Sequence, residues 1–75
     1  MELKEFVQLF AEELEDTSVE IITPSTVYKD LEEWSSLTAL SIISMVDENF
    51  EKRLTGADLK SVNTIEELYK LVLSK

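Results

Sequence analysis

The sequence predicts an all-α fold, a small four-helix bundle with three main helices and one short helix, formed by residues 1–75 as a single domain. Apolar residues recur at steps of three and four along three long stretches, which is the period of a helix and not of a strand. Gly and Pro occur once each and 44% of the residues are apolar, so a disordered chain is not expected. The single β-branched stretch has no second strand to pair with, and a lone strand is unstable.

The first helix is predicted over residues 2–14. Its apolar side chains share one face at helical spacing: Leu3, Phe6, Val7, Phe10 and Leu14. Residues 15–18 end this periodicity, and a connection of about twenty residues follows, which is long for a compact domain.

Within that connection, residues 19–23 form either a short strand or an extended loop whose isoleucines cap the core. Pro24 removes a backbone donor and keeps the residue before it away from helical angles. Residues 25–28 are expected to form one helical turn that returns Val27, Tyr28 and Leu31 to the core.

The second helix is predicted to begin at Ser35 or Ser36 and to end near Glu51. Its apolar residues cover more than half of its circumference, so we expect it to be the most buried helix. Its exposed side is marked by three acidic residues, Asp47, Glu48 and Glu51.

Two capping boxes predict the remaining helices. Thr55 and Asp58 have the spacing that starts a short third helix carrying Leu59. Thr64 and Glu67 have the same spacing and open a last helix. The apolar face of that helix contains Ile65, Leu68, Tyr69 and Val72. The long first connection gives the bundle one overhand crossing.

Composition excludes several functions. The chain has no Cys and no His, so it lacks the commonest nucleophile, general base and metal ligands. Its adjacent carboxylates point about 100° apart on a helix, which does not suit an acid–base pair. No oxygen ligands recur at the spacing of a calcium loop. We therefore expect no catalytic residues, no metal site and no enzymatic activity.

The location and the partners follow from hydropathy and charge. No apolar run approaches membrane-spanning length, and residues 1–5 lack the layout of a signal peptide, so a cytoplasmic protein without membrane insertion is expected. Sixteen acidic and seven basic residues give a net charge of −9. Such a charge repels nucleic acid and favours basic partner surfaces. The alternative explanation is that the acidic residues only keep a small protein soluble.

The serine pair at residues 35–36 is the strongest functional candidate. A hydroxyl at the N-terminus of a helix lies among unpaired N–H groups, where the helix dipole favours a phosphate ester. Serine is also a preferred N-cap residue, and from spacing alone capping is the better explanation.

The sequence resembles the acyl carrier protein family, small acidic four-helix bundles whose signature Asp-Ser-Leu opens the second helix. The resemblance covers essentially the whole chain. Its landmarks here are Leu31, Glu33 and Trp34, the run SSLTALSI at 35–42, the acidic run closed by Phe50 at 47–50, Leu54, the pair at 58–59, and residues 64–68.

The resemblance implies that a phosphopantetheinyl transferase moves 4′-phosphopantetheine from coenzyme A to Ser36, with Ser35 and Leu37 as flanking recognition residues. The arm would carry acyl groups as thioesters to basic-surfaced enzymes of fatty acid, polyketide or related biosynthesis. An aminoacyl or peptidyl cargo is the alternative. The carrier is expected to be a monomer that docks through Leu37, Asp47, Glu48 and Glu51. An acyl pocket between the helices would be lined by candidate core residues: Tyr28, Leu40, Val46, Leu54, Leu59, Val62 and Leu68.

Two positions depart from the family pattern. Ser35 replaces the usual Asp, which removes a carboxylate from the transferase site and leaves Ser35 itself as a possible acceptor. Ser41 replaces a usual Glu on the exposed face. These changes indicate a specialised carrier. They also motivate a second hypothesis, an unmodified protein-interaction domain with a carrier-like fold. An enzyme ranks last.

Overall fold

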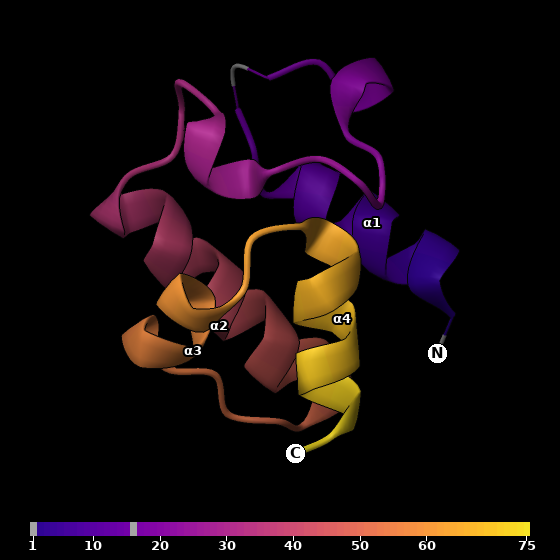
Figure 1. The fold of residues 1–75 in the computed structure, drawn as a ribbon, viewed down its shortest axis with the longest axis vertical. Helices are drawn as coiled ribbons and strands as arrows, with labels where there is room; N and C mark the ends of the chain where they lie inside the picture. Colours follow the sequence, from indigo (N-terminus) through magenta and orange to yellow (C-terminus); the bar gives the residue numbers. More distant parts are fainter. Residues whose placement is uncertain (1, 16) are drawn as a thin grey trace.

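Four α-helices build the molecule in a computed structural model that describes residues 2–15 and 17–75 (Figure 1). They are α1 (Leu3–Glu12), α2 (Ser36–Phe50), α3 (Gly56–Ser61) and α4 (Ile65–Leu73). Two 3-10 turns, η1 (Val19–Ile21) and η2 (Tyr28–Asp30), interrupt the long connection between α1 and α2. The predicted small all-α bundle is confirmed. Asp16, which belongs to the predicted break at residues 15–18, lies outside the described residues.

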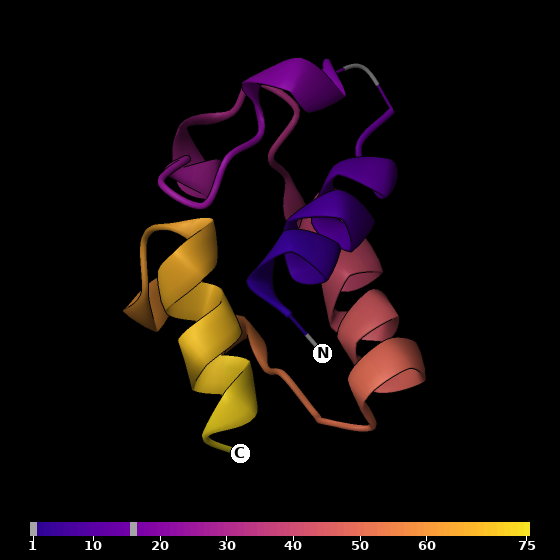
Figure 2. The same ribbon diagram turned by 90° about the vertical axis from the view of Figure 1, so that its right-hand side faces the viewer.

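The helices α1, α2 and α4 surround one core. Helix α1 packs against both α2 and α4 and runs opposite to them (Figures 1 and 2). The connection from α1 to α2 crosses the end of the bundle that is farthest from the C-terminus (Figure 2). It is joined to the start of α4, because the N–H groups of Ile65 and Glu66 donate to the carbonyls of Thr26 and Pro24. These bonds fix the loop that leads into α2.

Aromatic rings form the centre of the core. Phe6, Phe10 and Tyr28 are fully buried. Phe6 contacts Phe50 edge to face at 5.5 Å, and Phe10 lies 5.8 Å from Tyr28. Burying a side chain of this size contributes about 1.5–3 kcal/mol, so a few rings hold much of a small core together. Because Tyr28 belongs to η2, the long connection is part of this core.

The first half of the chain differs in detail from the prediction. The helical part of the first segment is Leu3–Glu12, although the predicted core residue Leu14 is still buried. Residues 19–21 form a 3-10 turn capped by the side chain of Ser18. Of the two isoleucines expected to cap the core, Ile22 is buried but Ile21 is 59% exposed.

The turn predicted at residues 25–28 lies later, at Tyr28–Asp30. Tyr28 is buried and Leu31 packs against the core, as expected. The expectation that Val27 is a core residue is wrong. Val27 pairs with Thr64 in an isolated antiparallel bridge and leaves its side chain exposed. The turn follows directly after this backbone pairing with a distant residue, which side-chain hydropathy does not reveal.

Helix α2 starts at Ser36, one of the two predicted positions, and it ends at Phe50. The expectation that it is the most buried helix is wrong. Four of its fifteen residues are buried, compared with three of the nine in α4. Leu37 and Leu40 are 76% and 61% exposed, because α2 lies at the side of the bundle with one face outward.

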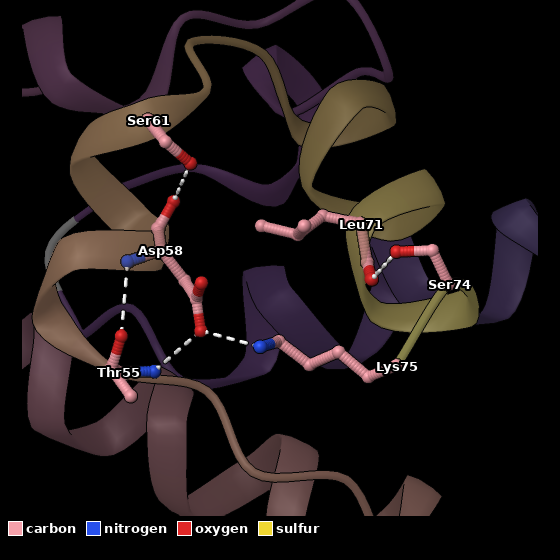
Figure 3. Close-up of polar contacts among 6 residues, drawn as sticks. All are labelled: Thr55, Asp58, Ser61, Leu71, Ser74 and Lys75. Carbon is pink, nitrogen blue, oxygen red and sulfur yellow. Dashed lines mark hydrogen bonds and ion pairs between the residues drawn. The ribbon is translucent and has the colours of Figure 1, made fainter.

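Both predicted capping boxes are present. Thr55 accepts from the Asp58 N–H at 3.1 Å, and Asp58 accepts from the Thr55 N–H at 3.0 Å. Asp58 also forms an ion pair with Lys75 at 2.7 Å, which ties α3 to the end of α4 (Figure 3). At the start of α4, Glu67 accepts from the N–H groups of Thr64 and Asn63. These bonds satisfy donors that a helix start leaves unpaired.

The capping carboxylates predict acid sensitivity. The backbone N–H groups of Thr64 and Asn63 lower the pKa of Glu67, and the bond to Lys75 lowers the pKa of Asp58. A carboxylate whose pKa is lower in the folded state stabilises the fold above its unfolded pKa of about 4, and this contribution disappears as the pH falls through the folded pKa. We expect the unfolding temperature to fall below pH 4, and to fall less steeply in Glu67→Gln.

Circular dichroism melts between pH 3 and pH 7 test this expectation. Glu66→Gln is the matched control, because the Glu66 carboxylate makes no hydrogen bond with the described residues and sits on the same turn. Identical pH profiles for Glu67→Gln and the unchanged protein would contradict the expectation.

Candidate functional site

The two adjacent serines have different roles in the structure. The Ser35 oxygen accepts from the Thr38 N–H at 3.3 Å, as an N-cap does. The Thr38 hydroxyl donates a hydrogen bond to the Glu33 carbonyl at 2.8 Å. Because a hydroxyl has one donor, Ser35 is the donor in the 3.3 Å contact between Ser35 Oγ and Thr38 Oγ1. The Ser35 hydroxyl therefore acts both as an acceptor and as a donor of hydrogen bonds within the first turn of α2.

Ser36 is the first residue of α2 and is exposed. Its hydroxyl makes no hydrogen bond with residues 2–15 and 17–75. The first turn of α2 contains no acidic residue, whereas α1, α3 and α4 each have one or two. The positive end of the α2 dipole therefore has no acidic residue in its own first turn, and it favours a negative ester on this oxygen. An accessible, unbonded hydroxyl in this field fits a covalently attached phosphate group.

The different bonding of the two hydroxyls predicts different mutants. Ser35→Ala removes the cap and is expected to lower the free energy of unfolding by about 1 kcal/mol. Ser36 stays exposed in this variant, so modification of Ser36 is expected to continue. Urea unfolding and intact mass after treatment with coenzyme A and a transferase measure the two effects. Loss of modification in a Ser35→Ala protein that is still folded would contradict this expectation, and mapping of the modified peptide in the unchanged protein would then show which serine is the acceptor.

A groove of about 540 Å³ lies beside Ser36, between the first half of α2, the η2 turn and α3. Its apolar wall consists of Trp34, Ala39, Leu40, Ile43 and Leu59. Gly56 lies at the start of α3, and the two serines and two lysines, Lys29 and Lys60, complete the lining. A groove of this size is within the range of small-molecule sites. One of its lining residues is Ser36, which lies at the positive end of the α2 dipole.

Trp34 holds one side of this groove in place. Its ring stacks on Phe10 with centroids 6.2 Å apart and an interplanar angle of 6°. It also contacts Tyr28 at 4.8 Å. The ring is half-buried, so it packs against the core, as its type alone suggests, and also faces the groove. The residues before Ser36 are therefore anchored to the aromatic core.

Two of the seven side chains proposed for an acyl pocket, Leu40 and Leu59, line this groove. The other five lie elsewhere: Tyr28, Val46, Leu54 and Leu68 are buried in the core, and Val62 packs against it. Leu40 is largely exposed because the groove is open. The entry of an acyl chain between the helices stays a prediction.

The four residues proposed for docking are exposed, but they do not form one patch around Ser36. Leu37 adjoins Ser36 and is 76% exposed. Asp47 and Glu48 follow Ser36 by eleven and twelve residues, which places them roughly 16–18 Å away along the helix. Glu51 follows the last turn in a left-handed conformation, with φ of 56°. These acids can contact only a partner that covers the length of α2.

Other acidic residues lie nearer to Leu37. A shallow surface depression joins Leu37, Thr38 and Ser41 to Glu13, Glu15 and Glu33. The Glu33 carboxylate accepts from the Glu15 N–H and the Thr17 hydroxyl, so it is held across the connection. The sequence pattern did not indicate these neighbours, because they come from the end of α1 and from a loop.

Lys29, Lys60, Ala39, Ile43 and Gly56 are groove residues that the sequence did not single out. The groove joins three segments that are far apart in the chain, and periodicity only reports neighbours on one helix. A partial signal was present, since Gly56, Leu59 and Lys60 are spaced to share one face of α3.

Within residues 2–15 and 17–75 no cluster of three acidic, His or Cys side chains could hold a metal ion. Among the helices described by the structure, none has the length and hydropathy needed to cross a membrane.

Comparison with known proteins gives one match. The family model for the phosphopantetheine attachment site matches residues 4–72, a range that includes Ser36 and the whole groove. No curated protein and no solved structure matches the chain.

Proposed function

Because this chain belongs to the phosphopantetheine attachment site family, whose members carry 4′-phosphopantetheine, we propose that Ser36 is the residue to which the group is attached. The chain is a carrier domain, which agrees with the absence of catalytic chemistry expected from its composition. The group supplies the thiol that the polypeptide lacks, and acyl cargo binds to it as a thioester.

The assignment to Ser36 rests on one observation, the different hydrogen bonding of the two adjacent serine hydroxyls. Ser35 holds the helix start through two hydrogen bonds, and Ser36 is exposed and makes no hydrogen bond with the residues that the structure describes. A phosphate on Ser35 would break the cap. A phosphate on Ser36 would add charge at the positive end of α2 without removing a bond. The geometry supports Ser36 over Ser35.

Ser35 also substitutes for the carboxylate of the family pattern. It caps α2 without adding a carboxylate at the cap position, so the cap itself does not oppose a phosphate on Ser36. We propose that the transferase recognises this site through Leu37, the exposed apolar residue next to Ser36, and through helix geometry. Recognition by a carboxylate on the residue directly before Ser36 has no counterpart here.

The proposed cargo is an acyl intermediate of fatty acid, polyketide or related biosynthesis. The apolar wall of the groove, with Trp34, Leu40 and Ile43, supports an acyl chain over a polar aminoacyl group. The proposed partners are a phosphopantetheinyl transferase and acyl-transferring or ligating enzymes with basic docking surfaces, which complement the net charge of −9. A cytoplasmic monomer completes the proposal.

An unmodified interaction domain is the second candidate, favoured by Ser35 in place of the usual carboxylate. Intact mass spectrometry distinguishes the two. The purified chain is incubated with coenzyme A and a broad-specificity transferase, and one phosphopantetheine of added mass supports the carrier. The same measurement on protein from its native cell shows whether the modification occurs there. No gain in either experiment would favour the interaction domain.

A further inference from the structure

The groove beside Ser36 has the opposite charge to the rest of the chain. The sequence contains sixteen acidic and seven basic residues, yet two of the ten groove residues are lysine and none is Asp or Glu. The positive end of α2, which has no acidic residue in its own first turn, borders the same space, since Ser35 and Ser36 are also lining residues. Within an anionic protein this groove is therefore locally suited to an anion.

Lys29 is held at this groove by the backbone of α3. Its ammonium donates to the Lys60 carbonyl at 2.7 Å and to Asn63 Oδ1 at 3.4 Å. An ammonium group has three N–H donors, so one remains for another acceptor. The Glu67 carboxylate, at the start of α4, also interacts with the charge of Lys29. Lys29 therefore has a fixed position and a partly compensated charge.

Lys60 supplies the uncompensated charge. Its side chain is exposed, lines the groove and has no ion-pair or hydrogen-bond partner in the described part of the chain. The Lys29 ammonium also contacts the backbone of Lys60, through its bond to the Lys60 carbonyl. Both lysines line the groove that the apolar wall borders.

Resting on the proposed function, we propose that Lys29 and Lys60 form an anion subsite that binds an anionic group of the loaded arm. An apolar wall with cations beside it fits an apolar stem that carries negative oxygen atoms. Two groups offer this chemistry: the phosphodiester next to Ser36, and a carboxylate at the free end of a dicarboxylic acyl cargo.

The test compares three loaded forms of the full chain. Ser36 is loaded from coenzyme A, from butyryl-coenzyme A and from succinyl-coenzyme A, and each product is verified by intact mass. The last two cargoes have four carbons and differ in the terminal carboxylate. Unfolding temperatures are measured at low salt for the unchanged protein, for Lys60→Gln and for the control Lys70→Gln. Lys70 is exposed on α4 and does not line the groove.

The expected result is a smaller loading-induced rise of the unfolding temperature in Lys60→Gln, by about 2–5 °C, with Lys70→Gln unaffected. If all three forms lose this rise, the bound group is the phosphodiester. If only the succinyl form loses it, the bound group is the cargo carboxylate. High salt should remove the difference, because exposed charges are screened.

Equal loading-induced shifts in all three proteins, for all three cargoes, would overturn the subsite and leave the carrier function intact. A missing mass gain on Ser36 would overturn the carrier function, and the subsite with it. Lys29 is not the primary variant, because its replacement also removes two hydrogen bonds to the α3 region.

Discussion

Ser36→Ala is expected to abolish modification by coenzyme A and transferase completely. The substitution removes the only atom of that side chain that can form the phosphate ester. It leaves the helix start in place, since the cap belongs to Ser35 and Thr38. Alanine is also the best helix former, so the folded state should be retained with unchanged or slightly higher stability. Intact mass after incubation measures the loss, and circular dichroism establishes the fold.

Ser35→Ala and Ser41→Ala serve as matched controls for this experiment. Ser41 lies one and a half turns further along α2, and its hydroxyl donates to the Leu37 carbonyl within the helix. Both controls should gain one phosphopantetheine. A mass gain in Ser36→Ala would show that another hydroxyl is the acceptor, and mapping of the modified peptide would then locate it.

Tyr28→Phe is expected to lower the free energy of unfolding by about 1–3 kcal/mol. The buried Tyr28 hydroxyl donates to the Leu59 carbonyl at 2.5 Å and lies 3.1 Å from the Val62 carbonyl. These carbonyls belong to the last residues of α3 and to the residue that follows it, so one hydroxyl links η2 to the C-terminal end of α3. Phenylalanine keeps the ring and leaves the carbonyls without this donor. Urea unfolding followed by circular dichroism gives the difference.

The same hydroxyl predicts an alkaline signature. Burial, with a smaller effect from the charge of Glu67, raises the pKa of Tyr28 to about 12. In the unfolded chain the group titrates near its ordinary value of about 10, so between these values only the unfolded chain has released the proton. Stability due to Tyr28 is therefore present below pH 10 and falls as the pH rises toward 12.

Tyr28→Phe should lack this part of the alkaline loss, so the stabilities of the two proteins should converge between pH 9 and pH 11.5. A constant difference across that range, or a destabilisation under about 0.5 kcal/mol at neutral pH, would contradict the role given to the hydroxyl. Tyr28→Leu, which also removes the ring, should cost more than Tyr28→Phe.

The sequence predicted the features that depend on residues close together in the chain, such as the starts of the helices. The starts of α3 and α4 follow from Thr55 with Asp58 and from Thr64 with Glu67, because a capping box is complete within four residues. The start of α2 at the serine pair follows in the same way, since capping predicts that one of two serines is used. The four-helix fold itself follows from hydrophobic periodicity.

Features that join distant segments were not predictable. The groove needs Lys29, Trp34 and Lys60 in one place, and nothing in their local sequence indicates that η2 lies against α3. The exposure of Leu40 was also missed, because an apolar pattern does not say which part of a helix circumference receives a neighbour. The sequence alone did not show which serine caps α2, because the answer depends on the positions of Thr38 and the Glu33 carbonyl.

The stacking of Trp34 has a practical consequence. It is the single tryptophan of the chain, and it lies both against the aromatic core and on the wall of the groove that begins at Ser36. Loading of Ser36 would change the surroundings of this indole ring, and its fluorescence emission would therefore respond to loading. Under the proposed function, the emission of Trp34 is expected to follow attachment and release of the cargo in real time without a label.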